Sequence, residues 1–294
     1  MAINPKNMAK ESLELNSNLK LFKIFKNLQH VSLKNDTYFQ VYEEIFSKYI
    51  GKQITFVEIG VLHGGSLFMW KEYFGDKARI IGIDLNPKAK ELEKHGFEIY
   101  IGSQSDKFFW NNFFSKVGKI DILLDDGGHS NAQQIITLDQ AINNTNDNGV
   151  IVTEDVHTSY LKKFGNPSKF SFINYSKKLI DVINSRFSSV KIKKNHTFKN
   201  KIYSISFYES ITAININSKK SINATVLKNN ENESFKTHDL RNTDYFPKIS
   251  KYIDNNLPIL HRVPVIRKII RYFFYSHNFF LKIKFYFILK KFFK

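Results

Sequence analysis

Apolar and polar positions alternate along residues 54–154 in the pattern of a parallel β-sheet whose strands are joined by helices. Short apolar runs with the length of buried strands are separated by amphipathic stretches that have the helical period. The predicted strands are 54–59, 79–84, 97–101, 120–125 and 150–155, and the predicted helices are 66–73, 87–94, 107–116 and 131–144. This order of elements predicts a doubly wound α/β domain.

The pattern changes after the fifth predicted strand. A further helix is predicted over 170–187, and two strand-like runs follow at 190–194 and 203–216. We expect these runs to form an antiparallel hairpin at the end of the sheet. Asn86 followed by Pro87 marks a helix start, because asparagine caps the first backbone N–H groups and proline is tolerated in the first turn.

Two flanks of different composition surround this domain. Apolar positions at helical spacing predict helices over 13–28 and 38–50, which together are expected to cap the strand ends. Asparagine and serine dominate an irregular segment after the hairpin. The predicted segments are a helical N-terminal cap (1–50), the sheet domain (51–216), a polar connector (217–256) and a basic, aromatic, helical tail (257–294).

Composition excludes several kinds of chemistry. The 294 residues include no cysteine, so there is no disulfide scaffold, thiolate zinc site, iron–sulfur cluster or cysteine nucleophile. Any metal site must therefore use oxygen or imidazole ligands. The first residues lack the basic and apolar regions of a secretory signal, and the uncharged run 272–281 is half of the roughly 20 residues that span a bilayer. We expect a cytoplasmic protein.

A glycine-rich turn follows the first predicted strand. The sequence EIGVLHGGS, from Glu58 to Ser66, lets the backbone approach a ligand closely, although its spacing is not that of the dinucleotide pattern G-x-G-x-x-G. Asp84 ends the second strand, where a carboxylate can accept hydrogen bonds from both ribose hydroxyls of a nucleoside. Gln104, after the third strand, could face an adenine. The alternative for the glycine-rich stretch is a tight turn that binds no ligand. Asp106, two residues after Gln104, could also face an adenine, but a role as the N-cap of the next helix is favoured.

Three carboxylates are expected at one edge of the sheet. Asp126 follows the fourth strand, and Glu154 and Asp155 end the fifth. They would repel one another without a compensating charge, and a hard divalent cation such as Mg²⁺ is the economical explanation. The alternative is that some of these acids cap helices or bind basic side chains. His129 lies three residues beyond Asp126, and an imidazole there could remove a proton near neutral pH.

At these residues the sequence resembles the class I S-adenosylmethionine-dependent methyltransferases, and within them the metal-dependent sugar O-methyltransferases of the macrolide type. The likeness extends over 38–215 and is carried by VEIGVLHGGSLFMWKEYFGDKARIIGIDLNP, GSQSD, LLDDGGHS, VTEDVHTSY and SISFYESITAI. The first stretch marks the superfamily, whereas DDGGHS followed by EDVHTSY is specific for the subgroup. Gly128 stands where the family commonly has serine, which removes one hydroxyl near the site.

The resemblance implies a Rossmann-like methyltransferase sheet, S-adenosylmethionine and Mg²⁺ as cofactors, and a sugar or glycoconjugate as the acceptor. The implied roles are cofactor binding by Glu58, Gly60 and Asp84, metal binding by Asp126, Glu154 and Asp155, and catalysis by His129 as general base. We further expect that the cofactor site includes Gly64, Ser66, Gln104 and Asp125, and that the substrate pocket is formed by Tyr38, His157 and Tyr160. We expect methylation of a sugar hydroxyl in capsule, surface polysaccharide or another glycoconjugate. The alternatives are a catechol-like or nucleic-acid acceptor, or a non-catalytic membrane-associated protein with the same fold.

The net charge of +17 is concentrated at the C-terminus. Residues 262–294 hold nine lysines and arginines, eleven phenylalanines and tyrosines, and no acidic residue. Clustered cations alternating with apolar rings favour an interfacial helix on an anionic membrane, on its inner face. Stacking on nucleic acid is the less favoured partner, and packing of the rings on the catalytic domain or on a second subunit is the other alternative. We also expect a homo-oligomer.

Overall fold

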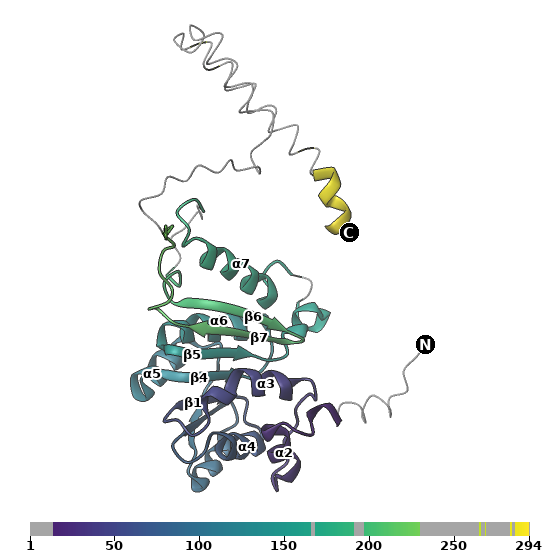
Figure 1. Ribbon diagram of the computed structural model, residues 1–294. Coiled ribbons are helices and arrows are strands. Elements are labelled where there is room, and N and C mark those ends of the chain that lie inside the picture. The colour runs from purple at the N-terminus through teal and green to yellow at the C-terminus, as the bar shows by residue number, and fades with distance from the viewer. Residues whose placement is uncertain are drawn as a thin grey trace. The chain divides into compact units, whose positions relative to one another are not determined.

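The computed structural model describes residues 14–165, 168–190, 197–229 and 286–293, together with Val265, Lys268 and Ile283. Contacts divide the chain into two compact units, Met1–Val226 and Leu227–Lys294. The first unit contains the sheet and all its helices (Figure 1). The described part of the second unit ends in a short 3₁₀ helix, η7 (Lys290–Phe293). Within the described residues, no helix combines the length and the apolar character needed to cross a membrane.

Seven strands form one sheet in the order β3-β2-β1-β4-β5-β7-β6. The strands are β1 (Thr55–Ile59), β2 (Arg79–Asp84), β3 (Glu98–Ile101), β4 (Ile120–Asp125), β5 (Thr145–Thr153), β6 (Ile202–Tyr208) and β7 (Ile211–Ile216). The first five are parallel, and β7 pairs antiparallel with β5 and β6. This arrangement confirms the Rossmann-like methyltransferase sheet. The strand order reverses between β1 and β4, the position where ligands bind in doubly wound sheets.

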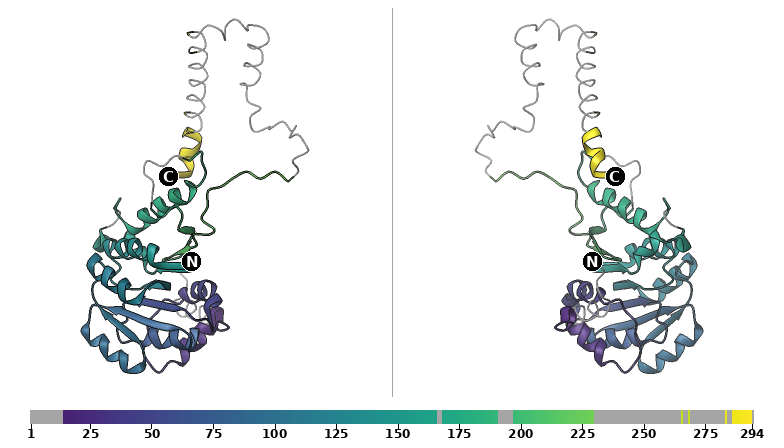
Figure 2. Two further views of the ribbon diagram at one scale, coloured as in Figure 1. Left: turned by 90° about the vertical axis from the view of Figure 1, so that its left-hand side faces the viewer. Right: turned by 90° about the vertical axis from the view of Figure 1, so that its right-hand side faces the viewer.

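Helices cover both faces of the sheet (Figures 1 and 2). The helices are α2 (Lys20–Asn27), α3 (Tyr38–Phe46), α4 (Gly65–Phe74), α5 (Lys107–Val117), α6 (Asn131–Ala141) and α7 (Phe172–Asn184), and the short 3₁₀ helices are η1 (Ser47–Tyr49), η2 (Pro87–His95), η3 (Ile142–Asn144), η4 (Val156–Tyr160) and η5 (Lys162–Phe164). One buried cluster joins α2, α3 and α4 to the sheet, and a second joins α5, α6 and α7 to its other face. Alternate strand residues divide between the two clusters, because successive side chains of a strand point to opposite faces.

Three of the seven predicted helices, 66–73, 87–94 and 107–116, form within one residue of their expected bounds, and two N-caps are confirmed. The α-helices that form within the other four predictions are shorter by three or more residues at one end. The side chain of Asn86 accepts a hydrogen bond from the backbone N–H of Lys88, and Asp106 accepts one from Phe108. Asp106 therefore has the capping role that the sequence favoured over ligand binding. The segment after Asn86 is a 3₁₀ helix rather than an α-helix.

The terminal hairpin forms from different residues than expected. Both of its strands come from the single predicted run 203–216, which turns at Glu209 and Ser210. Ser210 has a φ of 60°, a left-handed conformation that reverses the chain within two residues. Of the run 190–194, only Val190 belongs to the described residues, and it lies outside any strand.

The N-terminal helices share the core of the sheet. Leu21 of α2 and both Tyr42 and Phe46 of α3 are completely buried. The rings of Tyr42 and Phe46 meet the indole of Trp70 edge to face, at 5.3 and 5.5 Å between centroids. Residues 28–37 connect α2 to α3 without helical or strand structure. We call this connection the N-terminal segment, because it contributes a residue to the site.

Candidate active site

Two cavities meet at the carboxyl edge of the sheet, where both are lined by Gly60 and Leu62. The larger has a volume of about 200 Å³ and includes Asp84 and Gln104 in its wall. The smaller has a volume of about 60 Å³ and lies between the glycine-rich turn, Asp126 and the N-terminal segment. The wall of the larger cavity thus joins the ends of four strands, from β1 to β4, as expected for a nucleoside site in this fold.

The glycine-rich turn is shaped by its contact with the β4 strand end. Gly60 has a φ of 86°, and a Cβ atom on it would lie 2.2 Å from the carbonyl oxygen of Asp126. Gly64 has a φ of 81° and is the N-cap residue of α4. Both positions therefore require glycine. Asp84 holds the turn, because its Oδ2 accepts hydrogen bonds from the backbone N–H groups of Val61 and Leu62 at 3.0 and 3.1 Å.

Glu58 and Ser66 form a buried pair beneath this turn. The Ser66 hydroxyl donates to Glu58 Oε2 at 2.7 Å, and the Trp70 indole donates to Glu58 Oε1 at 3.2 Å. Burial raises the pKa of Glu58, and the ammonium group of Lys34 opposes this shift. Of the two residues, Ser66 lines the smaller cavity and Glu58 lines neither. Glu58 therefore supports the turn from below.

Gln104 and Asp125 form a second buried pair, next to the larger cavity. Gln104 Nε2 donates to Asp125 Oδ1 at 2.8 Å and to the hydroxyl of Thr137 at 3.1 Å, while its Oε1 accepts from the N–H of Gly128 at 2.9 Å. Burial raises the pKa of Asp125 to about 6. Its Oδ2 is buried without a hydrogen-bond partner among the described residues. Gln104 thus joins the cavity wall to the loop that follows β4.

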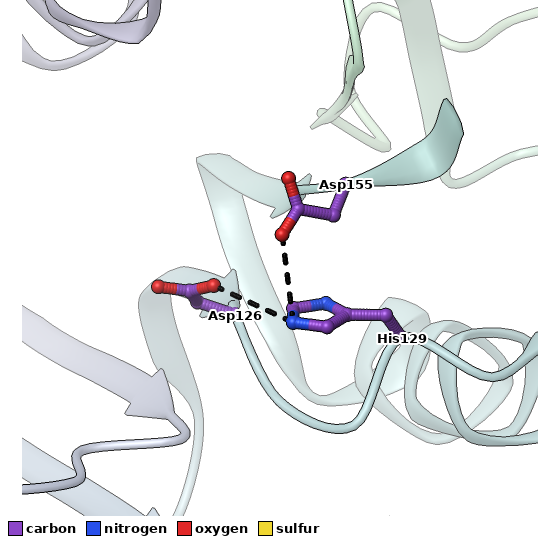
Figure 3. A group of neighbouring side chains, drawn as sticks. All are labelled: Asp126, His129 and Asp155. Atoms are coloured by element: carbon purple, nitrogen blue, oxygen red, sulfur yellow. Dashed lines mark ion pairs between the residues drawn. The ribbon is translucent and has the colours of Figure 1, made fainter. Parts of the chain in front are cut away.

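Asp126, His129 and Asp155 converge beside these cavities (Figure 3). Each offers one ligand atom, and these atoms lie within 4.8 Å of one another. His129 Nε2 is 3.5 Å from Asp155 Oδ2 and 4.0 Å from Asp126 Oδ1. The three come from the ends of the neighbouring strands β4 and β5, so the sheet itself brings them together. Two carboxylates and an imidazole can hold a divalent cation.

The backbone at this group is held in an unusual conformation. His129 and Asp155 have φ values of 56° and 54°, in the left-handed region that is uncommon for residues other than glycine. The carbonyl of His129 accepts a hydrogen bond from the Thr158 hydroxyl at 2.9 Å. Ser130 then starts α6 with a capping box that includes Gln133. These contacts define where the His129 imidazole can lie.

Glu154, the third expected metal ligand, faces a different set of partners. Its carboxylate is buried, accepts a hydrogen bond from the Tyr42 hydroxyl and lies 3.2 Å from Lys34 Nζ. Burial raises the pKa of Glu154, whereas the Lys34 charge lowers it. The three expected carboxylates are therefore divided, since Asp126 and Asp155 each have an oxygen that faces His129, whereas the carboxylate of Glu154 contacts Lys34 and Tyr42.

Lys34 is a residue of the site that the sequence analysis missed. Its side chain is only 2% exposed, and its Nζ lies 2.5 Å from Asp126 Oδ2 and 3.6 Å from Glu58 Oε1. Burial alone would lower the pKa of Lys34, but the surrounding carboxylates outweigh it and raise the pKa above its ordinary value. The binding of acids by a basic side chain was one of the open alternatives. Helical spacing places the Tyr38 and Tyr42 hydroxyls on one face of α3, but Lys34 lies in the non-helical N-terminal segment, where no periodic pattern marks it.

The residues expected to form the substrate pocket surround Asp155. The Tyr38 hydroxyl donates to Asp155 Oδ1 at 2.5 Å. His157 Nδ1 lies 3.8 Å from the same oxygen and 2.5 Å from the hydroxyl of Ser210. Tyr160 is exposed. Tyr38 therefore contacts a candidate metal ligand directly, whereas the side chains of His157 and Tyr160 are exposed.

Comparisons with known proteins show which proteins the chain is similar to in sequence and fold. No family model matches the chain. It is 33% identical over 135 residues to the 8-demethyl-8-alpha-L-rhamnosyl tetracenomycin-C 2'-O-methyltransferase of Streptomyces olivaceus, covering 44% of this chain and 35% of that protein. It is 31% identical over 154 residues to the mycinamicin VI 2''-O-methyltransferase of Micromonospora griseorubida, covering 48% of this chain and 38% of that protein. The matched region thus spans little more than a third of these relatives.

The fold is also similar to that of a solved structure. The MycE methyltransferase of the mycinamycin biosynthetic pathway, in complex with Mg, SAH and mycinamycin VI, matches with a TM-score of 0.59 and 24% identity, over 68% of this chain and 53% of that chain. This likeness shows the fold. Together with the sequence matches, it confirms the resemblance that the motifs predicted.

Proposed function

Because the chain has the fold of class I S-adenosylmethionine-dependent methyltransferases and is similar in sequence to sugar O-methyltransferases, we propose that it methylates a sugar hydroxyl. The products are an O-methyl ether and S-adenosylhomocysteine. The observation that carries this proposal is the group Asp126, His129 and Asp155, which combines metal ligands with a base beside a nucleoside-sized cavity. The relatives act on sugars of glycosylated natural products, and a glycoconjugate or surface polysaccharide is the acceptor class that we propose for this chain.

The cavities fit the cofactor. Positions 60 and 64 leave no room for a side chain, so the backbone of the turn can approach a ligand. Asp84 and Gln104 belong to the wall of the larger cavity, where ribose and adenine would lie, and Ser66 lines the smaller one. Neither Glu58 nor Asp125 lines these cavities. In this arrangement Glu58 would support the glycine-rich turn, and Asp125 would support the loop that follows β4, through their hydrogen bonds.

The acidic group fits Mg²⁺. A hard cation prefers oxygen ligands and keeps water molecules that a substrate can replace, and Asp126 and Asp155 each direct one carboxylate oxygen toward the same space. When bound, Mg²⁺ would lower the pKa of a chelating sugar hydroxyl, and S-adenosylmethionine would supply an activated methyl group. His129 Nε2 would accept the hydroxyl proton, and Asp155 Oδ2, at 3.5 Å, would stabilise the resulting imidazolium.

A methyl-donor assay tests this function. We expect incorporation of labelled methyl from S-adenosylmethionine into nucleotide-sugars or glycosylated lipids when Mg²⁺ is present, and a loss of incorporation with EDTA that Mg²⁺ restores. A catechol acceptor and an RNA acceptor serve as comparisons. Incorporation into either of these, with none into any sugar, would contradict the proposed acceptor class, and no incorporation into any acceptor would contradict the activity.

We further infer that the tail binds the surface of an anionic membrane. Five large apolar residues are exposed in the described end of the tail, next to two lysines, Lys290 and Lys291. The exposed residues are Tyr286, Phe287, Ile288, Leu289 and Phe292. Apolar insertion and attraction of lysine to anionic lipid add in such segments. The tail would then place the enzyme at the inner face of the membrane.

The two lysines provide a test of membrane binding. Each basic residue near an anionic surface contributes about 1 kcal/mol, so we expect Lys290→Gln/Lys291→Gln to weaken binding to phosphatidylglycerol vesicles about 30-fold in a sedimentation assay. Lys162→Gln/Lys163→Gln is the matched control, because it removes two adjacent lysines from the sheet unit. Equal vesicle binding by both double variants and the unaltered chain would contradict the inference.

A further inference from the structure

The N-terminal segment inserts a cation between the cofactor cavity and the metal group. Lys34 lines the smaller cavity together with Ser66 and Asp126, and its ammonium group contacts three carboxylates, those of Glu58, Asp126 and Glu154. The backbone of this segment is seated by a close approach, since a Cβ atom on Gly65 would lie 2.0 Å from the carbonyl oxygen of Val31. The buried lysine therefore has a defined place in the site.

The ammonium group divides the oxygen atoms of Asp126. Oδ2 faces Lys34 Nζ at 2.5 Å, while Oδ1 faces His129 Nε2 at 4.0 Å. Asp155 is divided in the same way, because Tyr38 donates to its Oδ1 and its Oδ2 faces His129. One donor from the N-terminal region thus occupies one oxygen of each aspartate, and the other oxygen is directed into the space shared with His129.

Glu154 is buried and is held in place by Lys34 and Tyr42. Lys34 Nζ lies 3.2 and 3.3 Å from its two oxygens, and the Tyr42 hydroxyl donates to Oε1. A carboxylate with these contacts loses an ammonium partner if it turns toward a bound metal. Such a turn would give up the contacts of both Glu154 oxygens with Lys34 and the hydrogen bond from Tyr42. The contacts of Lys34 therefore oppose use of Glu154 by a divalent cation.

We propose that Lys34 is an internal counter-cation that positions Asp126 and Glu154 and thereby sets how tightly the site binds a divalent cation. This inference rests on the proposed metal-dependent function. With Lys34 in place, the outer oxygens of Asp126 and Asp155 would hold the cation, and Glu154 would balance the lysine. Two cations bound to opposite oxygens of one carboxylate lie within a few ångströms of each other. Even at the dielectric constant of water, their repulsion weakens metal binding about tenfold.

Removal of the lysine charge tests the proposal. We expect Lys34→Met to bind Mn²⁺ at least ten times more tightly than the unaltered chain, measured as a Kd by electron paramagnetic resonance or calorimetry without cofactor or acceptor. The melting temperature without metal should fall, and its rise on addition of Mn²⁺ should exceed that of the unaltered chain. Lys34→Arg keeps the charge and should keep the original Kd within a few-fold. Unchanged or weaker Mn²⁺ binding by Lys34→Met would overturn the proposal, because that is the result of a merely structural lysine.

Two further variants separate charge from packing. Lys34→Met/Glu154→Gln removes the lysine together with one partner carboxylate, and both its Kd and its metal-free melting temperature should return toward the original values. This double variant also provides the measurement if Lys34→Met does not fold without metal. A double variant that binds Mn²⁺ as tightly as Lys34→Met would contradict the pairing with Glu154.

Matched controls remove a polar group without changing the summed charge of Lys34 and the three carboxylates that it contacts. Tyr42→Phe deletes a donor to Glu154 and should lower the melting temperature without tighter metal binding. Lys20→Met removes a lysine whose ammonium donates to the carbonyl of Tyr73, and its Kd for Mn²⁺ should be unchanged. These readouts do not use methyl transfer. Failure of the proposed reaction with every acceptor would therefore leave the metal-binding result intact, and the converse also holds.

Discussion

Methyl transfer should fall at least a hundredfold when His129 is replaced by alanine, while binding of S-adenosylhomocysteine stays within a few-fold. General base catalysis by a positioned side chain contributes about 10²–10⁴-fold to a rate. His129 Nε2 faces the space shared by Asp126 and Asp155, and it is the only imidazole in that described group of candidate ligands. His129 does not line the larger cavity, in which the cofactor is proposed to bind, so S-adenosylhomocysteine should still bind to the variant.

The His129 variant is measured by single-turnover transfer of labelled methyl and by calorimetry with S-adenosylhomocysteine. His95→Ala is a suitable control, because His95 packs against Phe68 on the α2–α4 side of the sheet, away from the acidic group. It should retain the original rate. A His129→Ala rate above one tenth of the original would show that another group removes the proton.

Replacement of Asp126 by asparagine should weaken metal binding at least tenfold and reduce methyl transfer at least a hundredfold. The change removes the charge of one of two carboxylates directed at the proposed cation, and it also removes the partner of Lys34 at 2.5 Å. An amide is a weaker ligand for a hard cation than a carboxylate. Higher Mg²⁺ concentrations should restore part of the lost rate, since the geometry of the remaining ligands is kept.

The Asp126 prediction is checked by a Kd for Mn²⁺ and by the dependence of the rate on Mg²⁺. Asp76→Asn is the matched control, because Asp76 has a fully exposed side chain. Its Kd and rate should not change. If Asp126→Asn bound Mn²⁺ as tightly as the unaltered chain, the metal would not be held by the Asp126, His129 and Asp155 group.

The alternation of apolar runs and helical stretches predicted the parallel sheet, because burial on both faces requires continuous apolar strands. The parallel direction predicted for β4 and β5 then placed Asp126, His129 and Asp155 at one edge of the sheet. The hairpin was harder to predict. Its turn at Ser210 depends on a left-handed serine, a conformation that composition does not reveal.

Glu154 and Asp155 show where sequence reasoning ends. They are adjacent at the end of a strand, and the pattern alone treats them as equivalent ligands. In the folded chain the left-handed backbone at Asp155 directs its carboxylate to His129, while Glu154 remains buried against α3. The partner that distinguishes them, Lys34, is 120 residues away from Glu154 along the chain. A pairing over that distance depends on the packing of the N-terminal segment against the sheet edge.

By itself, the sequence determined the succession of five parallel strands and their connecting helices, the glycine positions that admit a ligand and an oxygen- and imidazole-based site without thiols. These follow from local rules of burial, backbone conformation and ligand chemistry. Only the tertiary structure decided which carboxylates face His129 and which of them a buried lysine contacts. The reason is burial, because the ammonium group of Lys34, enclosed by α3 and the strand ends, must lie against acidic oxygens. The position of this ammonium group then decides which carboxylate oxygens face His129.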